Sequence, residues 1–235
     1  MELNIDPTLS VYHLTDRVQK QSTTLNHRRT MNIISYEIEN ATLIDGARTR
    51  IFSSFQRMSR FIPQVERYKK LAQKAEMVYV FGIPDVQVPQ IENVTYIPLT
   101  TEDQLAREWF IISYGRGYAT MLSTEEQSRF TDKDTERVFR GLWTFQPTLT
   151  SIIAEWLTRV VNAAPMDFNE DDHDLVQQQE YITAIKRRLG VRLARQVNDP
   201  SMQTTMAELR TIIAQSLPHN QSINAASAPY NPASS

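Results

Sequence analysis

The segment Glu136–Phe145 constrains the fold of this chain more than any other part of the sequence. Its apolar side chains alternate along the chain and include Phe139, Trp143 and Phe145. Aromatic and β-branched side chains fit the pleated, half-buried surface of a sheet. Pro147 follows closely, and proline cannot donate to a sheet ladder but suits the first turn of a helix. The segment therefore predicts a core strand that is followed directly by a helix.

Five further segments have the composition of strands: Thr49–Gln56, Met77–Phe81, Val94–Leu99, Glu108–Tyr114 and Tyr118–Ser123. The run Met77–Phe81 is continuously apolar, which is typical of a strand buried on both faces. Pro98 interrupts Val94–Leu99 and predicts an edge strand or a strand end. The last two strands flank Gly115-Arg116-Gly117, which predicts a hairpin because glycine supplies positive φ angles.

Apolar residues at helical spacing predict six helices, and Gln21–Asn26 reads as a polar break between the first two. The helices are Val11–Val18 with Ser10 as its cap, Met31–Ile38 with Thr30 as its cap, Arg57–Lys74 with Pro63 in its first turn, Thr148–Asn162, Asp171–Val197 and Ser201–Leu217. One β-α-β step followed by hairpin-like strands predicts a mixed α/β (α+β) fold. We expect a mixed sheet of five to six strands with packed helices, and a C-terminal helical extension.

Composition excludes several classes of protein. The chain of 235 residues carries a net charge of −2, so no basic excess indicates nucleic-acid binding. It contains no cysteine, which excludes disulfides, thiolate metal sites and cysteine nucleophiles. The first residues resemble no signal peptide, and no window is apolar enough for a membrane span. We therefore expect a cytoplasmic protein.

Five sequence blocks resemble the DICT sensory domain of diguanylate cyclases and two-component systems: Phe52–Phe61, Arg67–Ala72, Val78–Gly82, Ala106–Phe110 and Phe139–Phe145. The resemblance runs from about Ser10 to Val161 and implies a sensory or signalling role, in a family that is largely cyanobacterial and archaeal. It implies no catalytic residues. We expect a stand-alone, cyanobacterial-type member with a sensory domain over 10–163, a helical extension over 164–217 and a disordered tail over 218–235.

The candidate binding residues are polar or aromatic side chains on these blocks. Gln56, Arg57 and Arg60 lie where a strand passes into a helix, whose free N–H groups attract anions. They predict a site for an anionic ligand or partner, although arginines at this spacing are also common on a solvated basic turn. Tyr79 and Trp109 are further candidates for ligand or partner binding. Arg140 completes the set, and it could equally pair with an acidic residue on a neighbouring strand.

Other motifs have a structural interpretation beside a functional one. The aromatic residues Trp109, Phe139, Trp143 and Phe145 could line an apolar ligand pocket, but alternating aromatics are more often core. Arg116 could reach a ligand, but paired glycines in a hairpin differ from a phosphate loop. The four histidines are scattered without ligand spacing, so we expect neither a metal site nor a cofactor.

These observations favour a sensory or signal-transduction protein without enzymatic activity. Its partners would be signalling proteins such as two-component or cyclic-dinucleotide components. The helix Asp171–Val197 could form a homodimer, dock on a partner or pack on its own domain. The alternative is a scaffold or assembly factor that binds a larger complex without sensing a ligand. A third hypothesis is an enzyme that uses Glu108 or Glu136 as a general acid or base.

Overall fold

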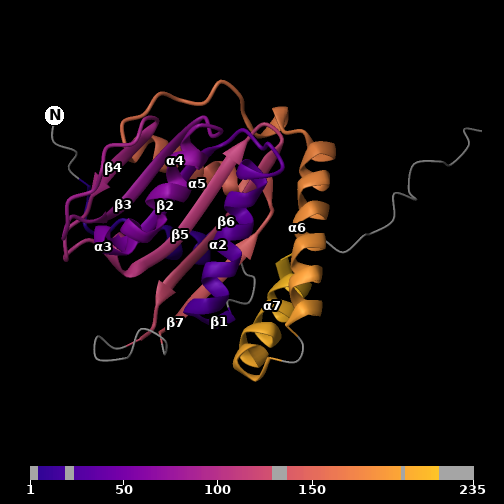
Figure 1. The fold of residues 1–235 in the computed structure, drawn as a ribbon. Helices are drawn as coiled ribbons and strands as arrows, with labels where there is room; N and C mark the ends of the chain where they lie inside the picture. The colour runs from indigo at the N-terminus through magenta and orange to yellow at the C-terminus, as the bar shows by residue number, and fades with distance from the viewer. Residues whose placement is uncertain (1–4, 19–23, 129–136, 197–198, 217–235) are drawn as a thin grey trace, which may run out of the picture.

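A computed structural model of the chain describes residues 5–18, 24–128, 137–196 and 199–216. The elements, with η for a 3-10 helix, are α1 (Val11–Val18), β1 (Thr24–His27), α2 (Arg28–Leu43), β2 (Arg50–Arg57), α3 (Met58–Phe61), η1 (Ile62–Gln64), α4 (Val65–Ala72), β3 (Met77–Ile83), β4 (Val94–Pro98), η2 (Gln104–Arg107), β5 (Glu108–Gly115), β6 (Tyr118–Glu126), β7 (Val138–Thr144), α5 (Pro147–Val160), η4 (Glu170–Asp172), α6 (Leu175–Arg195), η5 (Pro200–Met202) and α7 (Gln203–Ser216). Figure 1 shows their arrangement.

The centre of the fold is one mixed sheet with the strand order β1-β7-β6-β5-β2-β3-β4. The strands β2, β3 and β4 run parallel to one another, and all other neighbouring pairs are antiparallel. The predicted α/β class, the hairpin of β5 and β6 and the edge position of the strand with Pro98 are confirmed.

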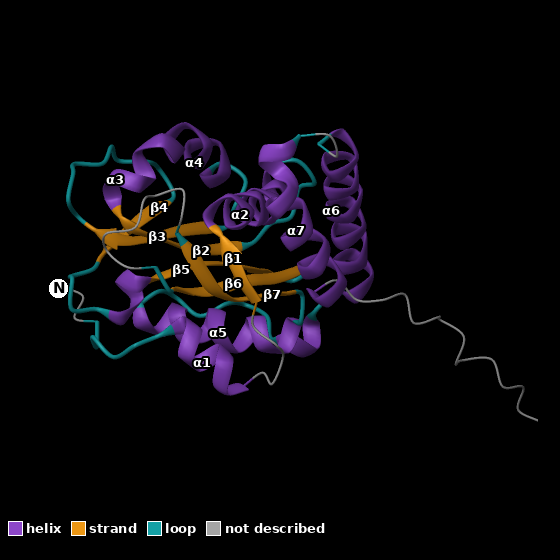
Figure 2. Ribbon diagram, turned by 90° about the horizontal axis from the view of Figure 1, so that it is seen from below, coloured by secondary structure: helices purple, strands orange, loops and turns teal. Residues whose placement is uncertain are grey.

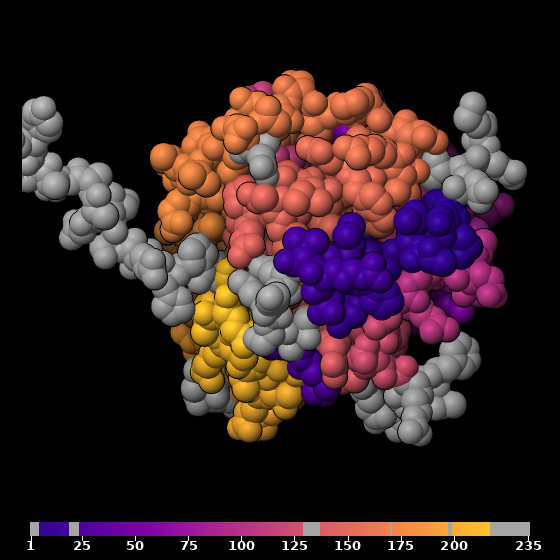
Figure 3. Space-filling model, turned by 180° about the vertical axis from the view of Figure 1, so that it is seen from behind, coloured from indigo at the N-terminus to yellow at the C-terminus, as the bar shows by residue number. Residues whose placement is uncertain are grey.

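Helices cover both faces of the sheet, as Figure 2 shows. On one side lie α1 and α5, which also form part of the surface seen in Figure 3. On the other side lie α2, α3, α4, α6 and α7. Successive side chains of β5 belong to the two hydrophobic clusters on opposite faces of the sheet. Ile111 packs on the face that α2 covers, whereas Phe110 and Ile112 pack on the face that α5 covers. Since successive side chains of a strand point to opposite faces, a central strand of this kind must be apolar throughout.

The strand β7 has the alternating burial that was predicted for the segment Glu136–Phe145. Phe139 and Trp143 are buried on the α2 side, and Leu142 is buried on the opposite side. The helix α5 begins at Pro147, as the sequence predicts. Glu136 itself lies outside the described residues.

Three predictions about local structure are wrong. The segment read as a polar break overlaps β1, so the described sheet has seven strands instead of five or six. The helix α2 begins at Arg28, which places Thr30 inside the helix and not at its cap. As a short edge strand beside β7, β1 needs few apolar side chains. The predicted helix over 57–74 is divided into α3, η1 and α4. Proline removes a helical N–H and crowds the preceding turn, so Pro63 explains the 3-10 turn Ile62–Gln64.

The C-terminal helices pack on the same side of the sheet as α2. In α6 the residues Ile182, Ile185 and Leu189 are buried, and in α7 Met206 and Leu209 are buried in the same core cluster. The outer domain limits at 10, 163 and 217 stay predictions, and the tail over 218–235 lies outside the described residues. None of the helices within the described ranges combines the length and the apolar character that a membrane crossing requires.

A buried carboxylate from β5 holds the start of α1. Glu108 is fully buried and accepts hydrogen bonds from the backbone N–H groups of Val11 at 3.0 Å and Tyr12 at 3.1 Å, and from the Ser10 hydroxyl at 2.5 Å. The Ser10 hydroxyl in turn accepts from the N–H of His13, which confirms Ser10 as the cap. Burial raises the pKa of Glu108 to about 8, against the lowering effect of these three donors. Glu108 is thus committed to attaching a helix, which speaks against its proposed use as a catalytic acid or base.

The raised pKa of Glu108 predicts a specific pH dependence of stability. Between about pH 4.5 and pH 8 the folded protein holds a proton that the unfolded chain releases, so this group makes the fold less stable as pH rises. We expect Glu108→Gln to gain stability relative to the natural protein between pH 5 and pH 8, by a few kcal/mol. Denaturant unfolding of both proteins at the two pH values measures this. A constant difference would contradict a raised pKa.

Candidate anion-binding site between α2 and the sheet

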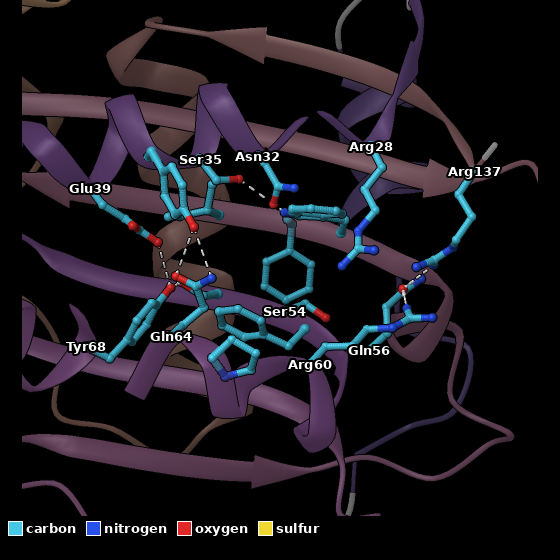
Figure 4. A pocket seen from close by; sticks show the side chains of 17 residues that line it. Arg28, Asn32, Ser35, Glu39, Ser54, Gln56, Arg60, Gln64, Tyr68 and Arg137 are labelled. Carbon is cyan, nitrogen blue, oxygen red and sulfur yellow. Dashed lines mark hydrogen bonds between the residues drawn. The ribbon is translucent and has the colours of Figure 1, made fainter. Parts of the chain in front are cut away.

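A cavity of about 160 Å³ lies between α2 and the strands β2 and β5, and the segment from α3 to α4 closes it at one side. Figure 4 shows the side chains around it. The lining is mixed, with charged, amide, hydroxyl and aromatic groups: Arg28, Asn32, Ser35, Tyr36, Glu39, Ser53, Ser54, Phe55, Gln56, Arg60, Pro63, Gln64, Tyr68, Trp109, Phe110, Ile111 and Arg137. Such a mixture is typical of a ligand site and unusual for a packed core.

One face of α2 supplies the polar wall of the cavity. Arg28, Asn32, Ser35 and Glu39 follow one another at intervals of four, three and four residues, which places them on one side of a helix. The Ser35 hydroxyl accepts a hydrogen bond of 3.2 Å from the indole N–H of Trp109 on β5. This bond fixes the aromatic wall against the polar wall.

Gln56 occupies an irregular position at the end of β2. Its φ of 63° is left-handed, and the pairing of β2 with β3 shifts register between Ser54 and Arg57. Residues other than glycine rarely adopt this backbone conformation. Backbone strain of this kind is often found at functional sites. The irregularity turns the buried Gln56 amide toward Glu126, whose carboxylate accepts from its Nε2 at 2.9 Å.

Three arginines gather at this end of the cavity: Arg28, Arg60 and Arg137 (Figure 4). The Gln56 carbonyl oxygen accepts from Arg137 at 2.6 Å and also from Arg60. Arg137 donates to Glu126 as well, through its Nε at 2.5 Å. Among the described residues Arg60 forms no ion pair. Within the described part of the chain, hydrogen bonds therefore join Gln56 to Arg60, Arg137 and Glu126, and Arg28 lines the cavity with them.

The pKa values record the crowding of these charges. Burial lowers the pKa of Arg60 to about 10, and the neighbouring charge of Arg137 acts in the same direction. Burial and Arg137 likewise lower the pKa of Arg28. Burial alone would raise the pKa of Glu126, but hydrogen bonds from Arg137 and Gln56 lower it on balance. Both arginines are thus destabilised as cations, and an anion in the cavity would relieve this.

The opposite end of the cavity has a different chemistry. The Glu39 carboxylate accepts from the Tyr68 hydroxyl at 3.0 Å and forms an ion pair with Arg67. Arg67 also donates to the carbonyl of Tyr36 at 3.1 Å and lies over its ring at 4.6 Å. Burial raises the pKa of Glu39 against the charge of Arg67. Glu39 thus forms a hydrogen bond with Tyr68 and an ion pair with Arg67, and Glu39 and Tyr68 form part of the wall at this end of the cavity.

The structure places three of the six candidate residues in the cavity lining: Gln56, Arg60 and Trp109. Arg57 is half-buried beside them but does not line the cavity. Tyr79 lies on the opposite face of the sheet, where its ring stacks on Phe52 at 5.0 Å. Arg140 is exposed on β7. Whether any of the six binds a ligand or partner remains a prediction.

Several lining residues escaped prediction. Arg28 and Arg137 meet because β1 pairs with β7, and the N–H of Arg28 donates to the carbonyl of Arg137 at 3.1 Å. Since β1 was not predicted, the sequence did not indicate that Arg28 and Arg137 are neighbours. The polar spacing along α2 is the sequence signal that could have indicated its wall of the cavity.

The other motifs have structural surroundings. Phe139 packs at right angles to Trp109, with 5.3 Å between ring centroids, while Trp143 and Phe145 are buried in the core. Arg116 lies over the ring of Phe168 at 5.2 Å, in the hairpin between β5 and β6. Among the described residues, no three histidine or acidic side chains are grouped closely enough to hold a metal ion.

Comparison with known proteins identifies the family. The model for the DICT domain, described as the sensory domain in diguanylate cyclases and two-component systems, matches residues 8–127. This is just over half of the chain, and the chain belongs to the DICT family. Four of the five resembling blocks lie within the match. The match is to a sensory domain, and no catalytic domain was found.

The comparison with solved structures adds no functional argument. The crystal structure of polyphosphate kinase from Porphyromonas gingivalis is similar at a TM-score of 0.36 and 17% sequence identity. The similarity covers 74% of this chain but 29% of the kinase chain, so this chain spans less than a third of that protein. No curated protein matched the chain.

The arginine network predicts a selective loss of stability. Arg137→Met would remove the partner of the half-buried Glu126 and one donor to Gln56. We expect a loss of about 1–3 kcal/mol in the free energy of unfolding, measured by denaturant titration. Arg159→Met is the matched control, because Arg159 forms an exposed pair with Glu155 at 3.5 Å, and we expect a change within about 0.5 kcal/mol. Equal losses in both variants would contradict the role given to Arg137.

Proposed function

We propose that this protein is a sensory protein without catalytic activity, whose cavity binds a small organic anion. The observation that carries the proposal is the convergence of Arg28, Arg60 and Arg137 on one cavity that also has an aromatic wall. Guanidinium groups bind carboxylates and phosphates through paired hydrogen bonds, and an aromatic wall accepts an apolar or planar body. The sensory description of the family supports the same role.

The volume of the cavity limits the ligand. At about 160 Å³ it compares with an engineered cavity of about 150 Å³ that holds benzene. A ligand of roughly ten non-hydrogen atoms or fewer therefore suits it, whereas a nucleotide would extend outside. A small carboxylate with a planar body matches the arginines at one end of the cavity and the aromatic wall beside them.

The helix α2 offers a route from the cavity to α7. Arg28 and Asn32 line the cavity, while the Glu208 carboxylate of α7 accepts from the N–H of His27 at 3.1 Å and from the Thr30 hydroxyl. Glu208 also contacts His27 Nδ1 at 2.6 Å. A ligand that moves Arg28 would thus act on the point where α7 holds the start of α2.

The same helix is fixed to α6 by buried charges. Arg188 donates to Glu37 at 2.6 Å and to both oxygens of Asp45 at 2.9 and 2.7 Å. Glu37 is nearly fully buried, so removal of Arg188 would take away its nearest charged partner and destabilise this contact. We propose that α6 and α7 carry the signal to signalling proteins such as two-component or cyclic-dinucleotide components, in line with the family description.

Ligand titration tests the proposal directly. We expect benzoate to raise the melting temperature of the protein and to bind in calorimetry, and the neutral benzamide to bind more weakly. Arg60→Met should weaken benzoate binding about tenfold to a hundredfold, since a hydrogen bond to a charged group contributes about 1.5–3 kcal/mol.

Arg57→Met is the control, because Arg57 lies three residues away and does not line the cavity. It should leave the affinity for benzoate unchanged. If benzoate, inorganic phosphate and other small anions all fail to bind, and native mass spectrometry finds no co-purified molecule, the proposal is wrong. A scaffold that senses nothing would then be favoured.

Communication through Glu208 is open to a separate measurement. A bound anion should slow amide hydrogen exchange in both α2 and α7 of the natural protein. In Glu208→Gln, which weakens the contacts to His27 and Thr30, the protection should remain in α2 and be lost in α7. Arg210→Gln, at an exposed position of the same helix, should retain both effects. Unchanged exchange of α7 in the natural protein would refute the route.

A further inference from the structure

We propose that the outer face of α6 is a self-association surface, on which two copies of the chain pair their α6 helices antiparallel about a twofold axis between Thr183 and Ala184. Figures 1 and 2 place α6 at the margin of the molecule. Its inner face is occupied, because Ile182, Ile185 and Leu189 are buried against the sheet side. A second copy could therefore bind only at the opposite, outer face of α6.

The outer face carries apolar side chains that the described parts of the chain leave open. Leu175 is 67% exposed, Val176 74% and Val191 46%. A shallow, mainly apolar groove runs along this face and is lined by Leu175, Val176, Gln179, Glu180, Thr183, Ala184 and Arg187. Leu175 and Val176 lie at the start of the helix and Val191 lies near its end, so exposed apolar groups occur at both ends of this face.

The spacing of these residues fits a seam between helices. Val176, Glu180, Thr183 and Arg187 follow at intervals of four, three and four residues, and Val191 follows after four more. This is the spacing that brings residues of one helix against a neighbouring helix. The helix of 21 residues is about 30 Å long, enough for three heptads.

The sequence of the face is complementary to itself in one orientation. Glu180 and Arg187 lie equally far from the midpoint between Thr183 and Ala184, so antiparallel helices bring each Glu180 against Arg187 of the second copy. Val176 and Val191 are also equidistant from that point and meet in the same way. Thr183 and Ala184, both small, lie at the crossing, where helices approach most closely. A twofold interface requires this reciprocal pairing.

The charges at the ends of α6 favour the same orientation. Asp171 and Asp172 precede the helix, and Arg195 lies in its last turn; Arg192 in the same turn contacts Glu37 of its own chain at 3.9 Å. Antiparallel pairing places the acidic end of one copy beside the basic end of the other, while parallel pairing would place like charges together. The macrodipoles of antiparallel helices are also opposed favourably. A second copy therefore fits this face better than a partner without such a pattern.

Charge reversal in the whole chain tests the pairing. Sedimentation velocity over a concentration series should detect a dimer of the natural protein. Glu180→Arg sets like charges against each other twice in each dimer, and so does Arg187→Glu, so each should weaken association at least tenfold. An equimolar mixture of the two variants, and the double variant E180R/R187E, should restore association.

The restoring combinations separate the proposal from misfolding, since a variant that fails to fold cannot be rescued by its complement. Lys70→Glu on α4, an exposed charge reversal far from this face in the sequence, is the control and should associate like the natural protein. The proposal is overturned if the natural protein is a monomer at about 100 µM, where a small transient interface still associates. It is equally overturned if the single variants stay dimeric or if the mixture stays dissociated.

Discussion

The coverage of the sheet on both faces is the constraint on which the rest of the structure depends. β5 lies between β6 and β2, and its side chains must satisfy two layers, with Ile111 on one side and Phe110 and Ile112 on the other. Each layer of helices then exists to cover one apolar face. Two carboxylates buried within this frame have hydrogen-bond or ion-pair partners: Glu108 at the start of α1, and Glu37 beside Arg188.

The cavity is the place where this rule is relaxed. A left-handed Gln56 interrupts β2, and the lining there is formed by guanidinium, amide and indole groups in place of aliphatic ones. Holding three guanidinium groups together costs stability, as the lowered pKa values of Arg28 and Arg60 indicate. The proposal that the cavity binds a small anion rests on this combination of destabilised cations and an open volume.

Much of the fold could be predicted because its elements have strong local patterns. The alternation of Phe139 and Trp143, the glycines between β5 and β6 and the apolar run of β3 each indicate their element within a few residues. Local patterns failed where tertiary contacts or a single residue determined the structure. The four residues of β1 form a strand only because they pair with the edge of β7. Pro63 divides a helical segment although its apolar spacing continues on both sides of the proline. Three of the six candidate residues line the cavity, because local patterns place residues on elements but do not place those elements in space. Gln56, Arg60 and Trp109 lie on predicted elements, whereas Tyr79 is separated from them by the sheet.

The sequence by itself determined the class of fold, the sensory family and the absence of cysteine chemistry, since these depend on composition, periodicity and ordered motifs. The tertiary structure alone decided that Arg28 and Arg137 meet, because residues distant along the chain become neighbours only when β1 joins β7. It also decided which side of α6 is buried and which is exposed. A helical stripe records that a face is apolar, but only the packing of the whole chain determines which of two faces its own core occupies.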